Sequence, residues 1–332
     1  MPPNINIVLM NVKISTCIFL WVKYKIKLCK MQTIFISPIF QKKGRTIMYN
    51  FPIGVIHSSF RTDRRTAIQK AAAMGANGIQ MYATTGENSP EALSAQARRD
   101  LLAEVKGEGM VFSALCGDLG HGFGNKELNP GLIEKSKRII DLAKDLETNV
   151  VTTHIGVVPS DKNHDRYKIM QEACFELATY ADTLDAHFAI ETGPETSAVL
   201  KEFLDALNST GVAVNLDPAN LCMVTGDDPV TAVHNLKRYI VHTHAKDGNR
   251  LAACIPEYIY GVLHPVPEEF NGVRFFEEVP LGTGSVDFPA YLKALEEIGY
   301  KGFLTIEREV GDNPDADIQT AFDFLKRTIA EN

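Results

Sequence analysis

From residue 48 onward the chain alternates eight short, apolar, β-branched runs with longer amphipathic segments. Runs of this length bounded by turn residues are typical of buried strands, and the segments between them have the periodicity of helices. The expected strands span 51–57, 77–83, 110–116, 149–155, 187–191, 212–217, 239–244 and 302–307. Eight strand–helix units in about 285 residues predict one α/β domain over 48–332, a (β/α)₈ TIM barrel.

Helix-start signals fall between these runs. Thr62 is a candidate N-cap, and Asp287 precedes another amphipathic segment. Ser89-Pro90, Asn129-Pro130 and Asn313-Pro314 each predict a helix that begins with proline in its first turn. The main alternative, a doubly wound sheet, would carry a G-x-G-x-x-G turn after an early strand, and the sequence has none there.

Charge divides the chain into two parts. Residues 1–47 contain seven Lys and one Arg and no acidic residue, whereas the whole chain has a net charge of −7, which leaves −15 for the remainder. An acidic body argues against nucleic acid and anionic membranes as partners. We interpret 1–47 as a basic leader outside the fold, because its apolar run is too short to span a bilayer and no small-residue cleavage site follows. The scattered cysteines suggest no disulfide framework, which favours a cytoplasmic location.

Four metal-ligating side chains lie at the ends of successive expected strands: Glu191, Asp217, His244 and Glu307. Because the carboxyl ends of barrel strands meet on one face, these side chains should converge. Three carboxylates and one imidazole suit Mn²⁺ best, with Mg²⁺ or Co²⁺ as alternatives, rather than a thiolate-bound structural zinc.

The spacing of the four residues supports the barrel. Glu191, Asp217 and His244 are 26 and 27 residues apart, about one strand–helix unit each. The step from His244 to Glu307 is 63 residues, and the excess falls in a Pro-, Gly- and aromatic-rich stretch. We expect residues 249–286 to form a lid-like excursion over the site.

Side chains alternate along a strand, so inward positions are two residues apart. The layer beneath the four ligands should therefore contain Ala189, Asn215, His242 and Thr305. This places His244 at the rim and makes His242 a hydrogen-bonded partner one layer deeper.

A bound divalent ion with open positions could polarise a sugar carbonyl and stabilise the enediolate left by loss of the neighbouring proton. A carboxylate on a dry barrel floor is a plausible base for that proton.

The chain resembles the xylose isomerase-like superfamily of sugar isomerases and epimerases from residue 48 to about 328. The motifs that carry the resemblance are IETGPE, NLDPANL, HTHAKDG, VPLGTGSVDFPAYLKALEEIGYKG and LTIERE. It implies that Glu191, Asp217, His244 and Glu307 hold the metal, and that Glu191 and Glu307 exchange the proton on opposite faces of a keto-sugar or sugar phosphate. It also implies that Arg250, six residues past the metal histidine, contacts the substrate. One departure is Asn220, where ketose 3-epimerases carry a histidine three residues after the metal aspartate.

Other residues near the strand ends are candidates for substrate contact. Lys246 could neutralise an oxyanion or be a solvated surface lysine. Glu195 could bind a sugar hydroxyl or cap the helix that starts near Ser197. His57 and His154 end the first and fourth expected strands.

Several functions share these features. The leading hypothesis is a metal-dependent isomerase or epimerase of a small sugar. The alternative is a lyase on the same scaffold, such as an inosose dehydratase, because both reactions begin by removing a proton next to a carbonyl. A repair endonuclease is disfavoured by the acidic body, and a non-catalytic scaffold by the intact ligand set. Homo-oligomers are common among barrels, and the sequence does not decide this.

Overall fold

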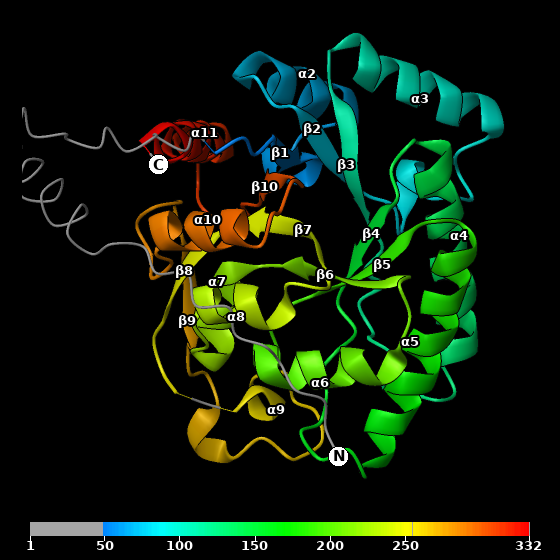
Figure 1. Cartoon of the computed structure of the whole chain (residues 1–332), viewed down its shortest axis with the longest axis vertical. Coiled ribbons are helices and arrows are strands. Elements are labelled where there is room, and N and C mark those ends of the chain that lie inside the picture. The colour runs from blue at the N-terminus through cyan, green and yellow to red at the C-terminus, as the bar shows by residue number, and fades with distance from the viewer. Residues whose placement is uncertain (1–48, 254, 332) are drawn as a thin grey trace, which may run out of the picture. The chain divides into compact units, whose positions relative to one another are not determined.

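The computed structural model describes residues 49–253 and 255–331. The predicted leader at 1–47, together with Cys254, lies outside the described residues. Within them, eight parallel strands close into a barrel in the order β1-β10-β7-β6-β5-β4-β3-β2, which confirms the predicted fold (Figure 1). The barrel strands are β1 (Ile53–Ile56), β2 (Gly78–Tyr82), β3 (Val111–Cys116), β4 (Val150–Thr153), β5 (His187–Glu191), β6 (Val212–Leu216), β7 (Ile240–Ala245) and β10 (Leu304–Ile306).

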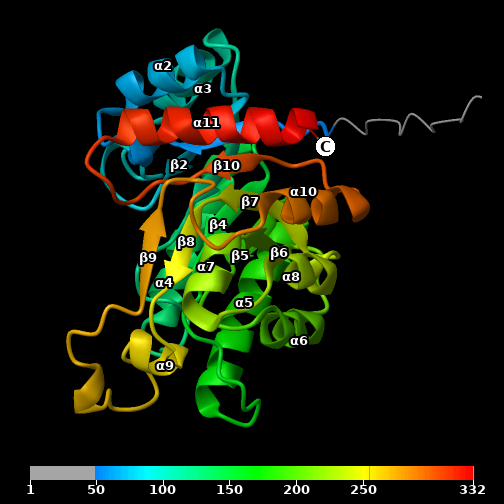
Figure 2. The ribbon, with the colours of Figure 1, turned by 90° about the vertical axis from the view of Figure 1, so that its left-hand side faces the viewer.

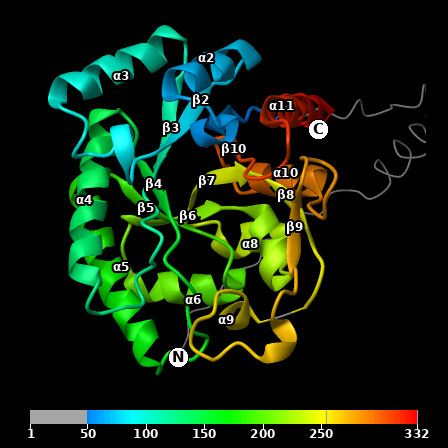
Figure 3. The same ribbon diagram turned by 180° about the vertical axis from the view of Figure 1, so that it is seen from behind.

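Helices follow the strands and surround the barrel, as the view from behind also shows (Figure 3). The longer ones are α2 (Arg64–Met74), α3 (Ala95–Gly107), α4 (Asn129–Asp145), α5 (Asp165–Thr183), α6 (Ser197–Leu207), α8 (Pro229–Leu236), α10 (Phe288–Glu297) and α11 (Pro314–Glu331). Short turns of helix are η1 (His57–Phe60), η2 (Gly86–Asn88), α7 (Pro218–Asn220), η3 (Leu221–Thr225), α9 (Pro256–Ile259) and η4 (Glu268–Phe270). The apolar faces of the longer helices pack against the strands and form the main core. None of the helices in 49–253 and 255–331 is both long and apolar enough to cross a membrane.

Two of the predicted helix starts are wrong. Ser89 lies in a turn, where its hydroxyl accepts a hydrogen bond from Ala92 N–H, and α3 begins six residues later with Ser94 as its N-cap. At α2, the carboxylate of Asp63 rather than Thr62 caps the helix, accepting from Thr66 N–H at 3.0 Å. The predicted starts of α4, α10 and α11 are confirmed.

The predicted excursion contains an antiparallel pair, β8 (Asp247–Arg250) and β9 (Phe276–Val279), with α9 and η4 in the long connection between them. Figure 2 shows this pair standing beside the barrel. Asp247 holds the end of the excursion next to its start. Its carboxylate accepts hydrogen bonds from the backbone N–H groups of Gly282, Gly284 and Val286. The excursion is therefore a folded element held against the end of β7.

The barrel interior is filled in layers of different polarity. A small apolar cluster of Ala114, Val150, Ala189 and Ala213 is separate from the main core. Elsewhere in the barrel, two strand glycines make room for Phe303. A Cβ at Gly78 would lie 2.6 Å from the Phe303 ring, and a Cβ at Gly54 would lie 2.8 Å from Thr305 Oγ1.

We predict that Gly78→Ala lowers the free energy of unfolding by about 1–3 kcal/mol, because the added methyl forces the Phe303 ring or a strand to shift. Gly107→Ala is the matched control: its Cβ meets nothing within 4 Å at the end of α3, and alanine favours helix. Chemical denaturation of the two variants and the parent chain measures both effects. Equal stability of all three proteins would contradict this view of the interior.

Candidate metal centre

Four buried side chains converge at the carboxyl end of the barrel, as the spacing predicts. One ligand atom from each of Glu191, Asp217, His244 and Glu307 lies within 4.8 Å of all the others. Glu191 ends β5 and His244 lies near the end of β7, while Asp217 and Glu307 directly follow β6 and β10. All four are buried, with exposed fractions between 0 and 7%.

The Nδ1 atom of His244 faces the three carboxylates. It lies 3.2 Å from Glu307 Oε2 and 3.5 Å from both Glu191 Oε1 and Asp217 Oδ2. These separations are close to the distance of about 3 Å between neighbouring ligands of a six-coordinate ion with bonds near 2.1 Å. Asp217 Oδ2 is buried and has no hydrogen-bond partner, whereas Oδ1 accepts from Asn220 N–H at 2.9 Å. The cluster therefore fits a divalent cation in its geometry and in its donor atoms.

Hydrogen bonds from β6 and α7 hold the carboxylate of Glu191 in place. Asn215 Nδ2 donates to Glu191 Oε2 at 3.1 Å, and Asn220 Nδ2 donates to Glu191 Oε1 at the same distance. The hydroxyl of Thr192 clamps the end of β6 by accepting from Asp217 N–H and donating to Asp217 C=O. Both oxygens of Glu191 are thus aimed before any ligand binds.

Three members of the predicted layer beneath the candidate ligands are joined by hydrogen bonds, whereas the fourth, Ala189, packs in the apolar cluster with Ala213. Asn215 Oδ1 lies 2.9 Å from His242 Nδ1, and His242 Nε2 lies 2.9 Å from Thr305 Oγ1. Because Asn215 donates to Glu191 through Nδ2, its Oδ1 must accept from His242 Nδ1–H, and Thr305 must donate to Nε2. Burial holds the pKa of His242 well below its usual range, with a smaller contribution from the charge of His244. His242 is therefore a neutral link in this chain and lies outside the ligand cluster.

Cations offset the negative charge of the cluster. Burial alone would lower the pKa of His244, but the charges of Glu307 and Glu191 raise it well above the usual value. Burial would raise the pKa of Glu307, but Lys246 and His244 hold it well below the usual value. Lys246 is buried, and its Nζ donates to Glu307 Oε2 at 3.1 Å and to Glu309 Oε2 at 2.6 Å.

Two of the four candidate ligands open onto a cavity of about 440 Å³. Glu191, Glu307, Asn220, Lys246 and His154 line it, and the excursion contributes a second wall. The members of that wall are Tyr260, Arg274, Phe276, Glu277 and Glu278. The excursion therefore borders the cavity.

His154 belongs to a pair that the sequence did not reveal. Its Nδ1 lies 3.1 Å from Asp118 Oδ2, and its Nε2 lies 3.5 Å from Glu191 Oε1. Burial would lower the pKa of His154, but the charges of Glu191 and Asp118 raise it to about 9. Asp118 lies in the loop after β3 and has no sequence signal beyond that position.

Three predicted substrate residues do not line this cavity. Arg250 and Glu195 line a second cavity of about 310 Å³, where Arg250 Nη1 donates to Thr225 C=O. His57 is buried beyond the end of β1, with its Nε2 3.4 Å from Asn88 Nδ2. Glu195 does not cap α6, because Thr196 is the N-cap.

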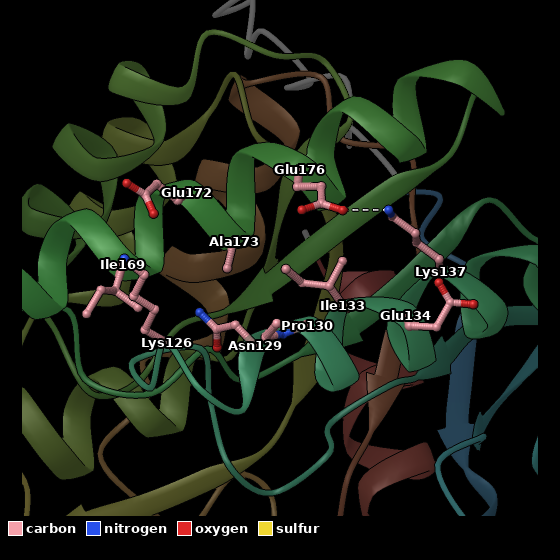
Figure 4. Close-up of a pocket in the computed structure, with 10 residues that line it drawn as sticks. All are labelled: Lys126, Asn129, Pro130, Ile133, Glu134, Lys137, Ile169, Glu172, Ala173 and Glu176. Atoms are coloured by element: carbon pink, nitrogen blue, oxygen red, sulfur yellow. Dashed lines mark hydrogen bonds and ion pairs between the residues drawn. The ribbon is translucent and has the colours of Figure 1, made fainter.

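A groove on the outer surface lies away from the candidate ligands. It runs between α4 and α5, has a volume of about 360 Å³, and is spanned by an ion pair of 2.6 Å between Lys137 and Glu176 (Figure 4). No residue of the ligand cluster lines it.

Residues 68–328 match the model of the xylose isomerase-like TIM barrel family. The chain belongs to this family. Among curated relatives, an inosose dehydratase from Clostridium beijerinckii is 23% identical over 155 residues, which is 44% of this chain and 48% of the relative. The rhizopine catabolism protein MocC from Rhizobium meliloti is 34% identical over 142 residues, 41% of this chain and 40% of the relative. Each match therefore spans less than half of the relative's length.

Solved structures of this fold agree over most of the chain. A xylose isomerase domain protein from Planctomyces limnophilus superposes with a TM-score of 0.68 at 25% identity, covering 84% of this chain and 96% of the other. The D-psicose 3-epimerase of Clostridium cellulolyticum H10 gives a TM-score of 0.63 at 16% identity, covering 84% and 99%. At 16% identity the second match shows the fold alone.

Glu195 provides a test of the buried charges. It has no hydrogen-bond partner of ordinary geometry, and burial raises its pKa to about 8. As pH rises from about 4.5 to about 8, the unfolded chain ionises while the folded one does not, so the folded state loses stability. We predict that Glu195→Gln is more stable than the parent chain by about 3 kcal/mol at pH 7, with a difference that nearly vanishes at pH 4.

Thermal and denaturant unfolding between pH 4 and pH 9 measures this difference. Glu257→Gln is the matched control, because Glu257 lines the same cavity but is more exposed. A stability difference for Glu195→Gln that does not change with pH would show that the carboxyl is not a buried neutral acid.

Proposed function

We propose that this protein is a divalent-metal-dependent isomerase or epimerase that acts on a keto-sugar or a sugar phosphate. The observation that supports this most is the pair of carboxylates, Glu191 and Glu307, which contribute to one buried ligand cluster and line one cavity. The ligands are Glu191, Asp217, His244 and Glu307, and Mn²⁺ suits them best, with Mg²⁺ or Co²⁺ as alternatives. The bound ion would polarise the carbonyl and stabilise the negative charge of the enediolate.

Proton transfer would be the task of the two glutamates. One carboxylate takes the proton from the carbon next to the carbonyl, and the electron pair of that C–H bond forms the C=C bond of the enediolate. The other carboxylic acid returns a proton to the opposite face. Lys246 donates to Glu307, and Asn215 and Asn220 donate to Glu191, so each oxygen that exchanges a proton is already oriented.

The surrounding residues would hold the substrate. Lys246 and His154 present cationic groups to the cavity and could stabilise negative charge on a substrate oxygen. Asn220 lines the same cavity beside Glu191. Arg250 and Glu195 line the second cavity. The same loops supply residues to both cavities, so the second cavity's lining lies only a few residues along the chain from that of the first. These two residues would contact a part of the substrate that extends beyond the reacting carbons. His57 would act only indirectly, since it lies behind the cavity.

A lyase is the second candidate. An inosose dehydratase is among the relatives, and Asn220 stands where ketose 3-epimerases carry a histidine. The same first proton transfer would then be followed by loss of a hydroxyl group β to the carbonyl. The cytoplasmic location remains a prediction, and the sequence leaves the oligomeric state open.

We predict that the metal-loaded protein exchanges deuterium from D₂O into the carbon next to the carbonyl of a substrate. NMR of D-fructose, D-psicose, D-tagatose and an inosose incubated with the protein separates the two candidates. A deuterated epimer or isomer supports the first, and a product that has lost water supports the lyase. Absence of both exchange and turnover, in this panel and in phosphorylated ketoses, would contradict the proton-transfer proposal.

We also predict that Glu307→Gln lowers the amount of bound Mn²⁺ to well below one equivalent, because an amide is a weaker and neutral ligand. Glu309→Gln is the matched control, since Glu309 also binds Lys246 but lies outside the cluster. Elemental analysis after loading and dialysis measures both variants. Full retention of Mn²⁺ by Glu307→Gln would remove Glu307 from the ligand set.

A further inference from the structure

Gln80 on β2 is a buried side chain to which the sequence analysis assigns no role. It is fully buried, and its Oε1 lies 3.1 Å from Nε2 of His244. Its Nε2 donates to Thr152 Oγ1 on β4 at 3.0 Å. Gln80 therefore reaches across the barrel interior from the first half of the chain to a candidate ligand in the second half.

The two nitrogens of His244 face different surroundings. Nδ1 is the atom near three carboxylate oxygens, whereas Nε2 faces the carbonyl oxygen of Gln80. The amide nitrogen of Asn215 also lies 3.2 Å from Nε2, but it donates a hydrogen bond to Glu191 Oε2. A neutral imidazole has one N–H and one lone pair, and the hydrogen bond made by one nitrogen decides which tautomer is present. Because the amide oxygen of Gln80 can only accept, it favours the hydrogen on Nε2 and leaves the lone pair of Nδ1 for an ion.

Thr152 stabilises this orientation of the amide. With Nε2 of Gln80 bonded to Thr152, the oxygen is the end of the amide that faces His244. The three residues have exposed fractions of 0–1%, so water does not compete for these hydrogen bonds. A lone pair on Nε2 of His244 would instead face the amide oxygen and leave Oε1 of Gln80 without its donor, which is costly in a buried site.

We propose that Gln80 is a positioning residue that fixes the Nε2–H tautomer of His244 and so presents Nδ1 to the metal. This inference rests on the proposed metal site, but it does not depend on the substrate or on the reaction. Groups that hold the second nitrogen of a metal-binding histidine commonly change metal affinity by 10–100-fold. Gln80 would act on the ion only through His244, from a strand that supplies no ligand itself.

The test uses three variants of the full chain. Gln80→Met has a similar size and lacks the strong acceptor, Gln80→Glu retains an oxygen acceptor, and Ser113→Ala is a control. Ser113 is also buried on a barrel strand, and its hydroxyl has no hydrogen-bond partner. Zn²⁺ is the probe, because it is diamagnetic and suits NMR of ¹⁵N-labelled histidine. A His244→Gln variant assigns the ring resonances.

In the parent chain we expect Zn²⁺ to shift the Nδ1 resonance of His244 while Nε2 remains protonated. Gln80→Met should bind Zn²⁺ about 10–100-fold more weakly, with Nε2 coordination or a mixture of the two modes. Gln80→Glu should restore Nδ1 coordination, and Ser113→Ala should match the parent chain. Isothermal titration gives the affinities independently of turnover.

Two results would overturn the role of Gln80. One is coordination through Nε2 in the parent chain, and the other is Gln80→Met with unchanged Zn²⁺ affinity and unchanged ring resonances. A chain that binds no Zn²⁺ at all overturns the metal site as well. A chain that binds Zn²⁺ through Nδ1 but turns over no substrate supports the role of Gln80 and contradicts the proposed reaction.

Discussion

The repulsion among three buried carboxylates is the constraint on which the rest of the site depends. Glu191, Asp217 and Glu307 share a space a few ångströms across, with almost no access to water. Like charges at this distance in a low dielectric cost several kcal/mol unless cations and hydrogen bonds offset them. Lys246 supplies positive charge, as does His244 until an ion takes the place of its Nδ1 proton, and Asn215 and Asn220 supply N–H donors. The remaining deficit, marked by the unpartnered Asp217 Oδ2, is what a divalent cation would fill.

The barrel makes this arrangement possible because each strand brings one inward side chain to the same rim. Hydrogen-bonded polar residues lie directly beneath the candidate ligands. There, Asn215, His242 and Thr305 link three neighbouring strands through their side chains. The excursion between β7 and β10 then closes one side of the cavity through residues such as Tyr260. The candidate ligands thus lie at the ends of barrel strands, and the residues that would contact a substrate come mainly from loops.

The convergence of the four strand-end side chains could be predicted because strand ends and unit spacing are local properties of the sequence. Alternation along a strand was enough to separate His244 from His242. Gln80 and Asp118 could not be predicted, because their partners lie 164 and 36 residues away and depend on the strand order and register. Arg250 and Glu195 line a second cavity for a similar reason, since the pairing of β8 with β9 sets the direction of Arg250. The failed helix start at Ser89 shows that a Ser-Pro pair also suits a turn.

The most direct test of the metal centre is a crystal structure of the Mn²⁺-loaded protein with anomalous diffraction at the manganese edge. We predict one strong anomalous peak within coordination distance of Glu191, Asp217, Glu307 and the Nδ1 atom of His244. No peak among these four side chains at saturating Mn²⁺, or a peak held by other residues, would contradict it.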